Sequence, residues 1–254
     1  MKSILQKLYL AAIFIFLYAP IAALVILSFN ESKYMSSWGG FSLKWYESLF
    51  SSKIIMSALQ NTLIIALISS IAATIIGTAA CMGINHMKKL PRTIVMGITN
   101  IPMLNADIVT GISLMLCFLA FGITLSMRTV ILAHITFNIP YVILSVMPRM
   151  KQLEPSTYEA ALDLGASPAY AFTKVVLPDI MPGILSGFLL AFTMSLDDFI
   201  ITHFTKGAGI NTISTLVYSE LRKGIKPNLY ALSTIMFAVV LVLLIIMNLP
   251  KRQR

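Results

Sequence analysis

Three aspartates stand inside apolar stretches of the chain, namely Asp107, Asp197 and Asp198. An ionisable residue within a membrane-spanning segment costs about 2.5–3.5 kcal/mol on insertion scales, so it is seldom kept without a partner or a water-filled cavity. No Lys or Arg lies deep inside any of these apolar stretches to neutralise the acids. The residue types therefore predict a polar pathway for a cation, whose charge would balance the carboxylates during passage.

Asp197 and Asp198 are neighbours on one predicted helix, so their side chains diverge by about 100°. They cannot both point straight down one pore axis. We expect one of them to face the pathway while the other caps a helix end or pairs with a partner subunit. An alternative without any transport role leaves Ser195 and Asp197 capping a local helix break and Asp107 satisfying another.

Aromatic and histidine side chains add weaker signals. Trp45 offers a cation–π face near the predicted outer entrance, although an anchor at the membrane interface explains it equally well. His134 and His203 are more typical of hydrogen-bonded interior residues than of proton carriers. No cluster has metal-ligand spacing and no phosphate-binding loop is present. We therefore expect no catalytic residue, no metal and no cofactor on this chain.

The composition is that of a polytopic membrane protein. Of the 254 residues, 57% are apolar and only 11% are charged, and the mean hydropathy is +0.85. Soluble domains carry about 25% charged residues, so this chain lacks the charge to cover a water-facing surface. The net charge of +9 is consistent with binding to nucleic acid, with contact with anionic lipid, or simply with loops that face the cytoplasm. Cys81 and Cys117 both lie in apolar runs and are predicted to be core or lipid-facing residues.

Six segments are long and apolar enough to cross a membrane, which needs about 20 residues. They are Leu8–Phe29, Ala58–Gly83, Thr93–Phe121, Ser126–Met147, Pro182–Phe204 and Tyr230–Leu249. The first is expected to be an uncleaved span, since no small-residue cleavage site follows it. An even number places both termini on one side, and the flanking Lys and Arg residues indicate the cytoplasm. The prediction is an all-α membrane protein with residues 1–254 as a single transmembrane domain.

Two of these spans carry helix breakers at membrane depth. Pro102 removes a backbone donor in the third span, and Asn105 and Asp107 then bring polar groups to the freed backbone. The fourth span contains His134 and the stretch 138–140, which ends in proline. Broken helices at this depth need protein or water around them. Both breaks are therefore expected beside an interior pathway, unless neighbouring helices simply satisfy a proline kink.

Between the fourth and fifth spans, the stretch Arg149–Met181 predicts a pair of short helices. Pro155 suits the first position of a helix, and Gly165 suits the left-handed residue that ends one. The dipeptide Ser167-Pro168 then supplies an N-cap and a first-turn proline, and Pro178 is expected to stop the second helix.

The first helix of this pair has an unusual surface. Glu159 and Asp163 are four residues apart and share one face as like charges, while Ala160 and Ala161 leave a low surface for close approach. A helix that rests on a membrane usually places Lys and Arg on its polar face, whereas this one places carboxylates there. We therefore favour a protein partner over a membrane surface.

The order Glu159-Ala160-Ala161, three residues, Gly165 and finally Leu177-Pro178 resembles the EAA loop of ABC importer permeases. In that family the loop is a coupling helix that docks in a cleft of a cytosolic ATPase subunit. The resemblance implies that Glu159, Ala160, Ala161 and Gly165 carry the docking here, on the cytoplasmic side. ATP and Mg would then be bound by the ATPase partner.

Nearly the whole chain is similar to the spermidine/putrescine permeases of the PotC type. The residues that carry this resemblance are Asn30, Trp45-Tyr46, Asn105–Val109, His134–Phe137 and Ser195–Phe199. In that group a proline usually precedes the acid of the third span, whereas Ala106 precedes Asp107 here.

The resemblance implies a MetI-like permease fold and a bacterial inner-membrane importer of a polyamine that works by alternating access. Its partners would be a second permease subunit, an ATPase pair and an external substrate-binding protein. The pathway would be lined by Trp45, Asp107, Asp197 and Asp198. A same-family permease for another small solute, such as an aminophosphonate or a metal chelate, stays open, as does a secondary transporter or channel. Those last two would not need the docking unit, and a membrane enzyme would need a nucleophile–base pair that the sequence lacks.

Overall fold

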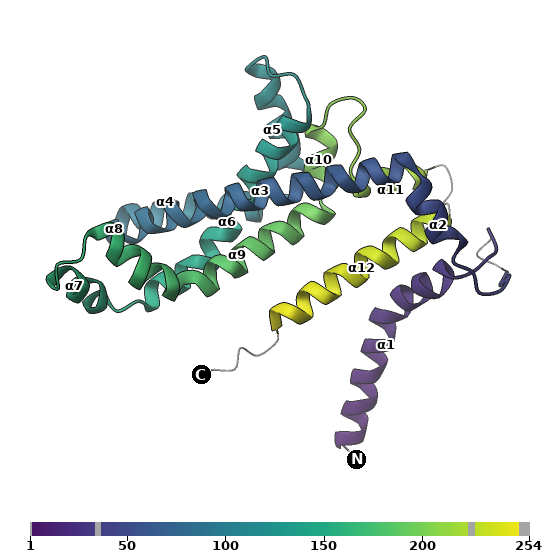
Figure 1. Ribbon diagram of the computed structural model, residues 1–254, viewed down its shortest axis with the longest axis horizontal. Coiled ribbons are helices and arrows are strands. Elements are labelled where there is room, and N and C mark those ends of the chain that lie inside the picture. The colour runs from purple at the N-terminus through teal and green to yellow at the C-terminus, as the bar shows by residue number, and fades with distance from the viewer. Residues whose placement is uncertain (1, 34–36, 223–226, 249–254) are drawn as a thin grey trace. The chain divides into compact units, whose positions relative to one another are not determined.

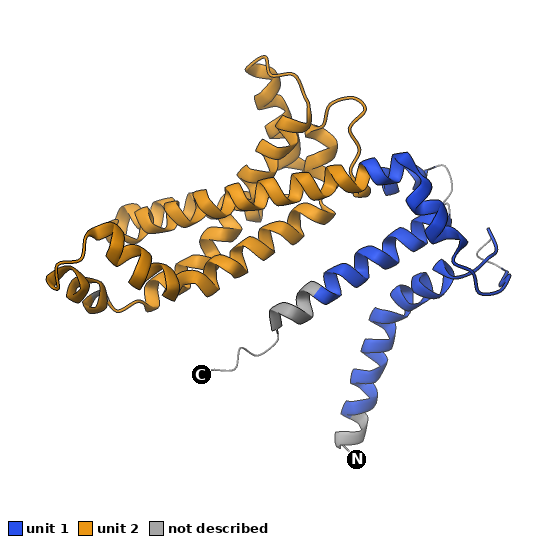
Figure 2. Ribbon diagram, viewed as in Figure 1, with its two compact units in different colours: residues 1–57, 216–254 blue, residues 58–215 orange. Residues whose placement is uncertain are grey.

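The computed structural model describes residues 2–33, 37–222 and 227–248 (Figure 1). Over these residues the secondary structure is helical, apart from one isolated bridge between Asn30 and Phe41. The chain divides into two compact units, one of residues 1–57 and 216–254 and one of residues 58–215 (Figure 2). The all-α class predicted from the sequence is confirmed.

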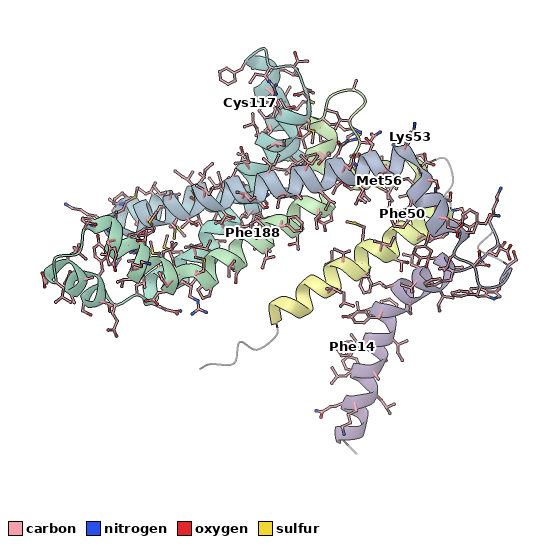
Figure 3. The ribbon with its side chains drawn as sticks, viewed as in Figure 1. Phe14, Phe50, Lys53, Met56, Cys117 and Phe188 are labelled. Atoms are coloured by element: carbon pink, nitrogen blue, oxygen red, sulfur yellow. The ribbon has the colours of Figure 1, made fainter. Side chains whose placement is uncertain are left out.

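The smaller unit contains α1 (Lys2–Ser28), α2 (Lys44–Ser51) and α12 (Pro227–Asn248), and α12 contacts both of the others. The apolar segment Gln6–Ser28 of α1 is exposed over nearly all its length, with side chains such as Phe14 projecting outward (Figure 3). Water solvates such a surface poorly, whereas hydrocarbon does not. This face therefore suits contact with lipid.

The larger unit is organised by three long helices. α3 (Lys53–Asn85) enters it after its first turn, and α6 (Met127–Gln152) packs along α9 (Leu177–Asp197). Small residues let these helices approach closely. A Cβ added to Gly77 of α3 would come within 2.8 Å of the Val142 side chain on α6, and one on Gly187 of α9 would lie 3.3 Å from the Val142 Cα. Val142 is fully buried at this crossing.

The third predicted span is broken, as expected from Pro102 and the polar residues that follow it. α4 (Lys89–Leu104) and α5 (Asp107–Ala120) are bent by 104° at Asn105 and Ala106. Cys117 lies exposed on α5 (Figure 3), whereas Cys81 of α3 is buried with its Sγ 3.9 Å from the Met147 Sδ. Of the two positions expected for these cysteines, Cys81 therefore occupies a core position and Cys117 an exposed position on an apolar helix.

Within the described residues, four single helices are long and apolar enough to span a membrane, and the bent pair α4–α5 makes a fifth candidate. The sixth predicted span falls on α12, whose apolar part over the described residues is the shorter Asn228–Val242. Leu249, the predicted end of that span, lies outside the described residues. The helical content and these spans agree with a six-span plan.

The predicted break in the fourth span is wrong, because α6 continues through Pro140. A proline inside a membrane helix forfeits one backbone hydrogen bond, and neighbouring helices can stabilise the helix around it. Here Val142 and Val146 next to it are fully buried against α9. The polar residues of this span, His134 and Asn138, hydrogen-bond to side chains of other helices instead of marking a break.

The prediction that Pro178 stops the second helix of the pair within Arg149–Met181 is also wrong. α8 (Pro168–Ala171) passes through a π-helical turn at Phe172–Val176 straight into α9, which carries Pro178 in its first turn. A proline ring clashes with the carbonyl group four residues earlier. The wider π turn immediately before Pro178 relieves that crowding, so residues 168–197 form one continuous helical stretch.

Candidate functional site

A cavity of about 380 Å³ lies where α9 ends and α10 (Ile200–Thr205) begins. α10 packs against α5 and α6 (Figure 1), and residues of α5, α6, α9 and α10, together with the break itself, line the cavity. The residues that line the cavity are Asp107, Phe137, Met194, Asp197, Asp198, Phe199, Ile200 and Ile201. The three aspartates singled out in the sequence are thus brought together from segments some 90 residues apart.

Two of these aspartates stand at helix ends, with exposed side chains. Asp107 is the first residue of α5, directly after the 104° bend. A carboxylate is favoured there by the partial positive charge of a helix N-terminus. Asp197 is the last residue of α9. Both are exposed to the cavity side of the chain and so are accessible to a cation.

Asp198 is different, because the protein itself uses its carboxylate. Its Oδ1 accepts from the Ile201 backbone N–H at 3.2 Å, and its Oδ2 accepts from the Thr202 backbone N–H at 2.7 Å and from Thr202 Oγ1 at 2.9 Å. His134 Nε2 lies 3.3 Å from the same Oδ2. Asp198 therefore caps the first turn of α10, as expected for one of the two neighbouring aspartates.

A second polar contact lies just before the break. Asn138 Nδ2 donates to Ser195 Oγ at 2.7 Å, and Ser195 Oγ is 3.1 Å from Ser69 Oγ of α3. All three side chains are buried. The sequence placed His134 correctly among hydrogen-bonded interior residues, but it did not pair His134 with Asp198. The sequence did contain one signal for that pairing, because His134 and Asp198 lie in adjacent predicted spans at a similar depth in the membrane.

Trp45 belongs to the other compact unit and is not among the residues that line the cavity. Its ring is 7% exposed, and its Nε1–H donates to the Asn30 carbonyl at 2.6 Å. Asn30 Oδ1 in turn accepts from the Gly39 backbone N–H at 2.8 Å. Trp45 thus packs the loop that precedes α2, and its contact with substrate stays a prediction.

The first helix of the pair predicted within Arg149–Met181, and the turn after it, have the local structure that their residues predict. α7 (Pro155–Asp163) begins at Pro155 and ends in a turn where Gly165 has a φ of +86°. Gly165 N–H donates to the Leu162 carbonyl at 2.9 Å and Ala166 N–H to the Ala161 carbonyl at 3.1 Å, which is a Schellman cap. Ser167 then caps α8 through Tyr170 N–H at 3.3 Å.

One face of α7 is exposed and does not pack against the rest of the described chain. Glu159 and Ala160 are exposed, and Ala161 is half-buried. Leu164, just after the helix, is 89% exposed. Tyr158, Glu159 and Leu162 also line a second cavity of about 490 Å³ between α7 and the ends of α3, α6 and α9.

Within the described part of the chain, no group of three or more His, Cys, Asp and Glu side chains is arranged to hold a metal ion. The acidic cavity instead combines carboxylates with Phe137 and Phe199, and none of the eight residues that line it is basic. Carboxylates beside aromatic rings suit an organic cation.

Comparison with known proteins places the chain in a family. Residues 73–250 match the family described as binding-protein-dependent transport system inner membrane component. The chain is 40% identical over 234 residues to the putrescine transport system permease protein PotI of Escherichia coli K12, covering 89% of this chain and 83% of that protein. It is 34% identical over 252 residues to the spermidine/putrescine permease PotC of Haemophilus influenzae, covering 99% and 98%.

Solved structures show the same fold. A bacterial ABC transporter involved in the import of the acidic polysaccharide alginate matches with a TM-score of 0.74 at 20% identity, covering 96% of this chain and 93% of that one. The MetNI methionine ABC transporter matches with a TM-score of 0.60 at 19% identity, covering 76% and 94%. This chain therefore belongs to the inner membrane permease components of binding-protein-dependent transport systems, in the group that includes the PotI and PotC permeases.

Proposed function

We propose that this chain is a permease subunit of an ATP-driven importer whose cargo is a polyamine, putrescine or spermidine. The observation that carries the proposal is the cavity at the α9–α10 break. It is lined by three aspartates and two phenylalanines and by no basic residue among the described ones. Polyamines are flexible chains with ammonium groups, so carboxylates and aromatic faces are the groups that bind them. The names of the relatives PotI and PotC point to the same cargo.

Transport would proceed by alternating access. An external binding protein delivers the polyamine, and closure of a separate ATPase pair moves the permease between outward and inward states. A second, related permease subunit completes the pathway. Asp107, Asp197 and Asp198 lie along this chain's half of it. Trp45 is kept as a candidate contact nearer the outer entrance.

The ATPase would dock on α7 through Glu159, Ala160, Ala161 and the turn at Gly165. The support for this is the exposed face of α7 and its Schellman-capped end. On this proposal both termini are cytoplasmic, this chain carries no catalytic residue or cofactor, and ATP and Mg bind to the ATPase subunits.

Uptake of radiolabelled spermidine and putrescine, in cells with and without this gene and its ATPase, tests the proposal. We expect uptake of at least one polyamine to depend on both genes. Unchanged polyamine uptake in the deletion strain, with loss of uptake of another solute, would refute the assigned cargo. A parallel strain that carries Glu47→Gln, which removes an exposed carboxylate of α2 that is not among the residues lining the cavity, controls for expression.

A further inference from the structure

We propose that the two neighbouring aspartates have different tasks: Asp198 is a positioning residue held by His134 and Thr202, while Asp107 and Asp197 bind the cation. This inference rests on the proposed function, because it assigns roles within the same cavity. It adds His134 and Thr202, neither of which lines the cavity, to the residues on which transport depends.

The first argument is the number of donors that Asp198 already accepts from. A carboxylate has about four lone-pair sites, two on each oxygen. Its Oδ2 accepts from the Thr202 N–H and the Thr202 hydroxyl, which fill both of its sites, and its Oδ1 accepts from the Ile201 N–H. His134 Nε2 lies 3.3 Å from the same Oδ2, and the Asp198 side chain is only 9% exposed. A passing ammonium group would meet at most one open site on this nearly buried carboxylate, so Asp198 serves to position the chain at the break.

The second argument concerns the proton on His134. The single hydroxyl proton of Thr202 is donated to Asp198, so Thr202 Oγ1 must accept from His134 Nε2 at 2.9 Å. His134 Nδ1 has no hydrogen-bond partner within the described residues, and the side chain is 1% exposed. His134 Nε2 therefore carries a hydrogen, and His134 contributes a hydrogen bond to the break.

The third argument is that α6 holds the chain on both sides of the break. His134 and Asn138 are four residues apart and share one face of α6. Asn138 bonds to Ser195 before the break, and His134 bonds to Thr202 after it. With both sides fixed, Asp197 at the end of α9 stays exposed beside Asp107 at the start of α5. Two free carboxylates from two helices match a cargo with two or more ammonium groups.

The test uses the complete transporter in proteoliposomes, with its second permease, ATPase pair and binding protein. The measured quantity is putrescine moved per ATP hydrolysed. Complexes that fail to fold contribute to neither number, so a simple loss of folded protein leaves this ratio unchanged. His134→Asn removes the donor at the Nε2 position, and we expect the ratio to fall about tenfold. His134→Gln places an amide N–H near that position, and we expect the ratio to recover to within about threefold of wild type.

Double variants separate the roles of the two aspartates, because residues that act as one unit give non-additive losses. Asp198→Asn combined with His134→Asn should lower the ratio no further than either change alone. Asp197→Asn combined with His134→Asn should multiply the two losses. Thr202→Val, which removes only the hydroxyl donor, should resemble His134→Asn, whereas Thr202→Ser should resemble wild type.

A wild-type ratio for His134→Asn would overturn the inference, as would multiplying losses for the pair at positions 134 and 198. These results are distinct from failure of the proposed function. In that case the wild-type complex would hydrolyse ATP in response to its binding protein yet move neither putrescine nor spermidine, and the division of roles would fall with it.

Discussion

The turn after α7 offers the sharpest test of how this permease engages its ATPase. Gly165 adopts a φ of +86°, and a Cβ added there meets no atom within 4 Å. Gly165→Ala therefore introduces backbone strain and no clash. A residue with a side chain in the left-handed region costs about 1–2 kcal/mol, which shifts the equilibrium between this turn and other conformations by about five- to thirty-fold.

If docking requires the turn, the affinity of the ATPase for the permease should fall by that factor. The measurement is binding of the labelled ATPase subunit to the permease complex in nanodiscs, over a range of ATPase concentrations. Gly165→Asn should lie close to wild type, because Asn tolerates this conformation better than other residues with a side chain. Gly97→Ala is the matched control, since Gly97 is helical and a Cβ there also meets nothing within 4 Å. Wild-type affinity for Gly165→Ala, or equal losses for both glycines, would refute the reasoning.

Three further outcomes follow from the same structure. Asp197→Asn should lower the initial rate of polyamine uptake at least about tenfold, the scale of one charge-assisted hydrogen bond, while Glu47→Gln leaves it unchanged. Glu159→Lys reverses a charge on the exposed face of α7 and should abolish ATP-driven uptake without preventing membrane insertion; intact uptake would contradict docking at this face. Gly77→Ala should destabilise the permease by about 1–3 kcal/mol through overpacking against α6, seen as a lower melting temperature in detergent, and Gly83→Ala, with open space around it, should not.

Much of the local structure followed from residue types alone. Pro155 begins α7, Gly165 ends it in the left-handed region, and Ser167 caps α8. The helix break at Asn105 lies where Pro102 and the polar residues after it placed it. These features depend on neighbours within one turn, and a sequence shows such neighbours directly.

The two wrong predictions share a cause, because both assigned a helix end from a proline alone. Pro140 sits in a helix whose next turns are buried against α9, and packing outweighs the lost backbone bond. Pro178 follows a π-helical turn that makes room for its ring. Neither the packing nor the turn has a signature within the few residues around the proline.

The sequence by itself determined that the chain is a bundle of apolar helices with acids it cannot neutralise locally, because run lengths and residue charges are properties of the chain. It also predicted that Asp197 and Asp198 point in different directions, on the premise that both lie in one helix, whereas α9 ends at Asp197 and Asp198 lies in the break before α10. Only the tertiary structure decided which of them is free. That choice depends on His134, more than 60 residues away, and on the hydrogen bond it supplies when α6 packs against α10.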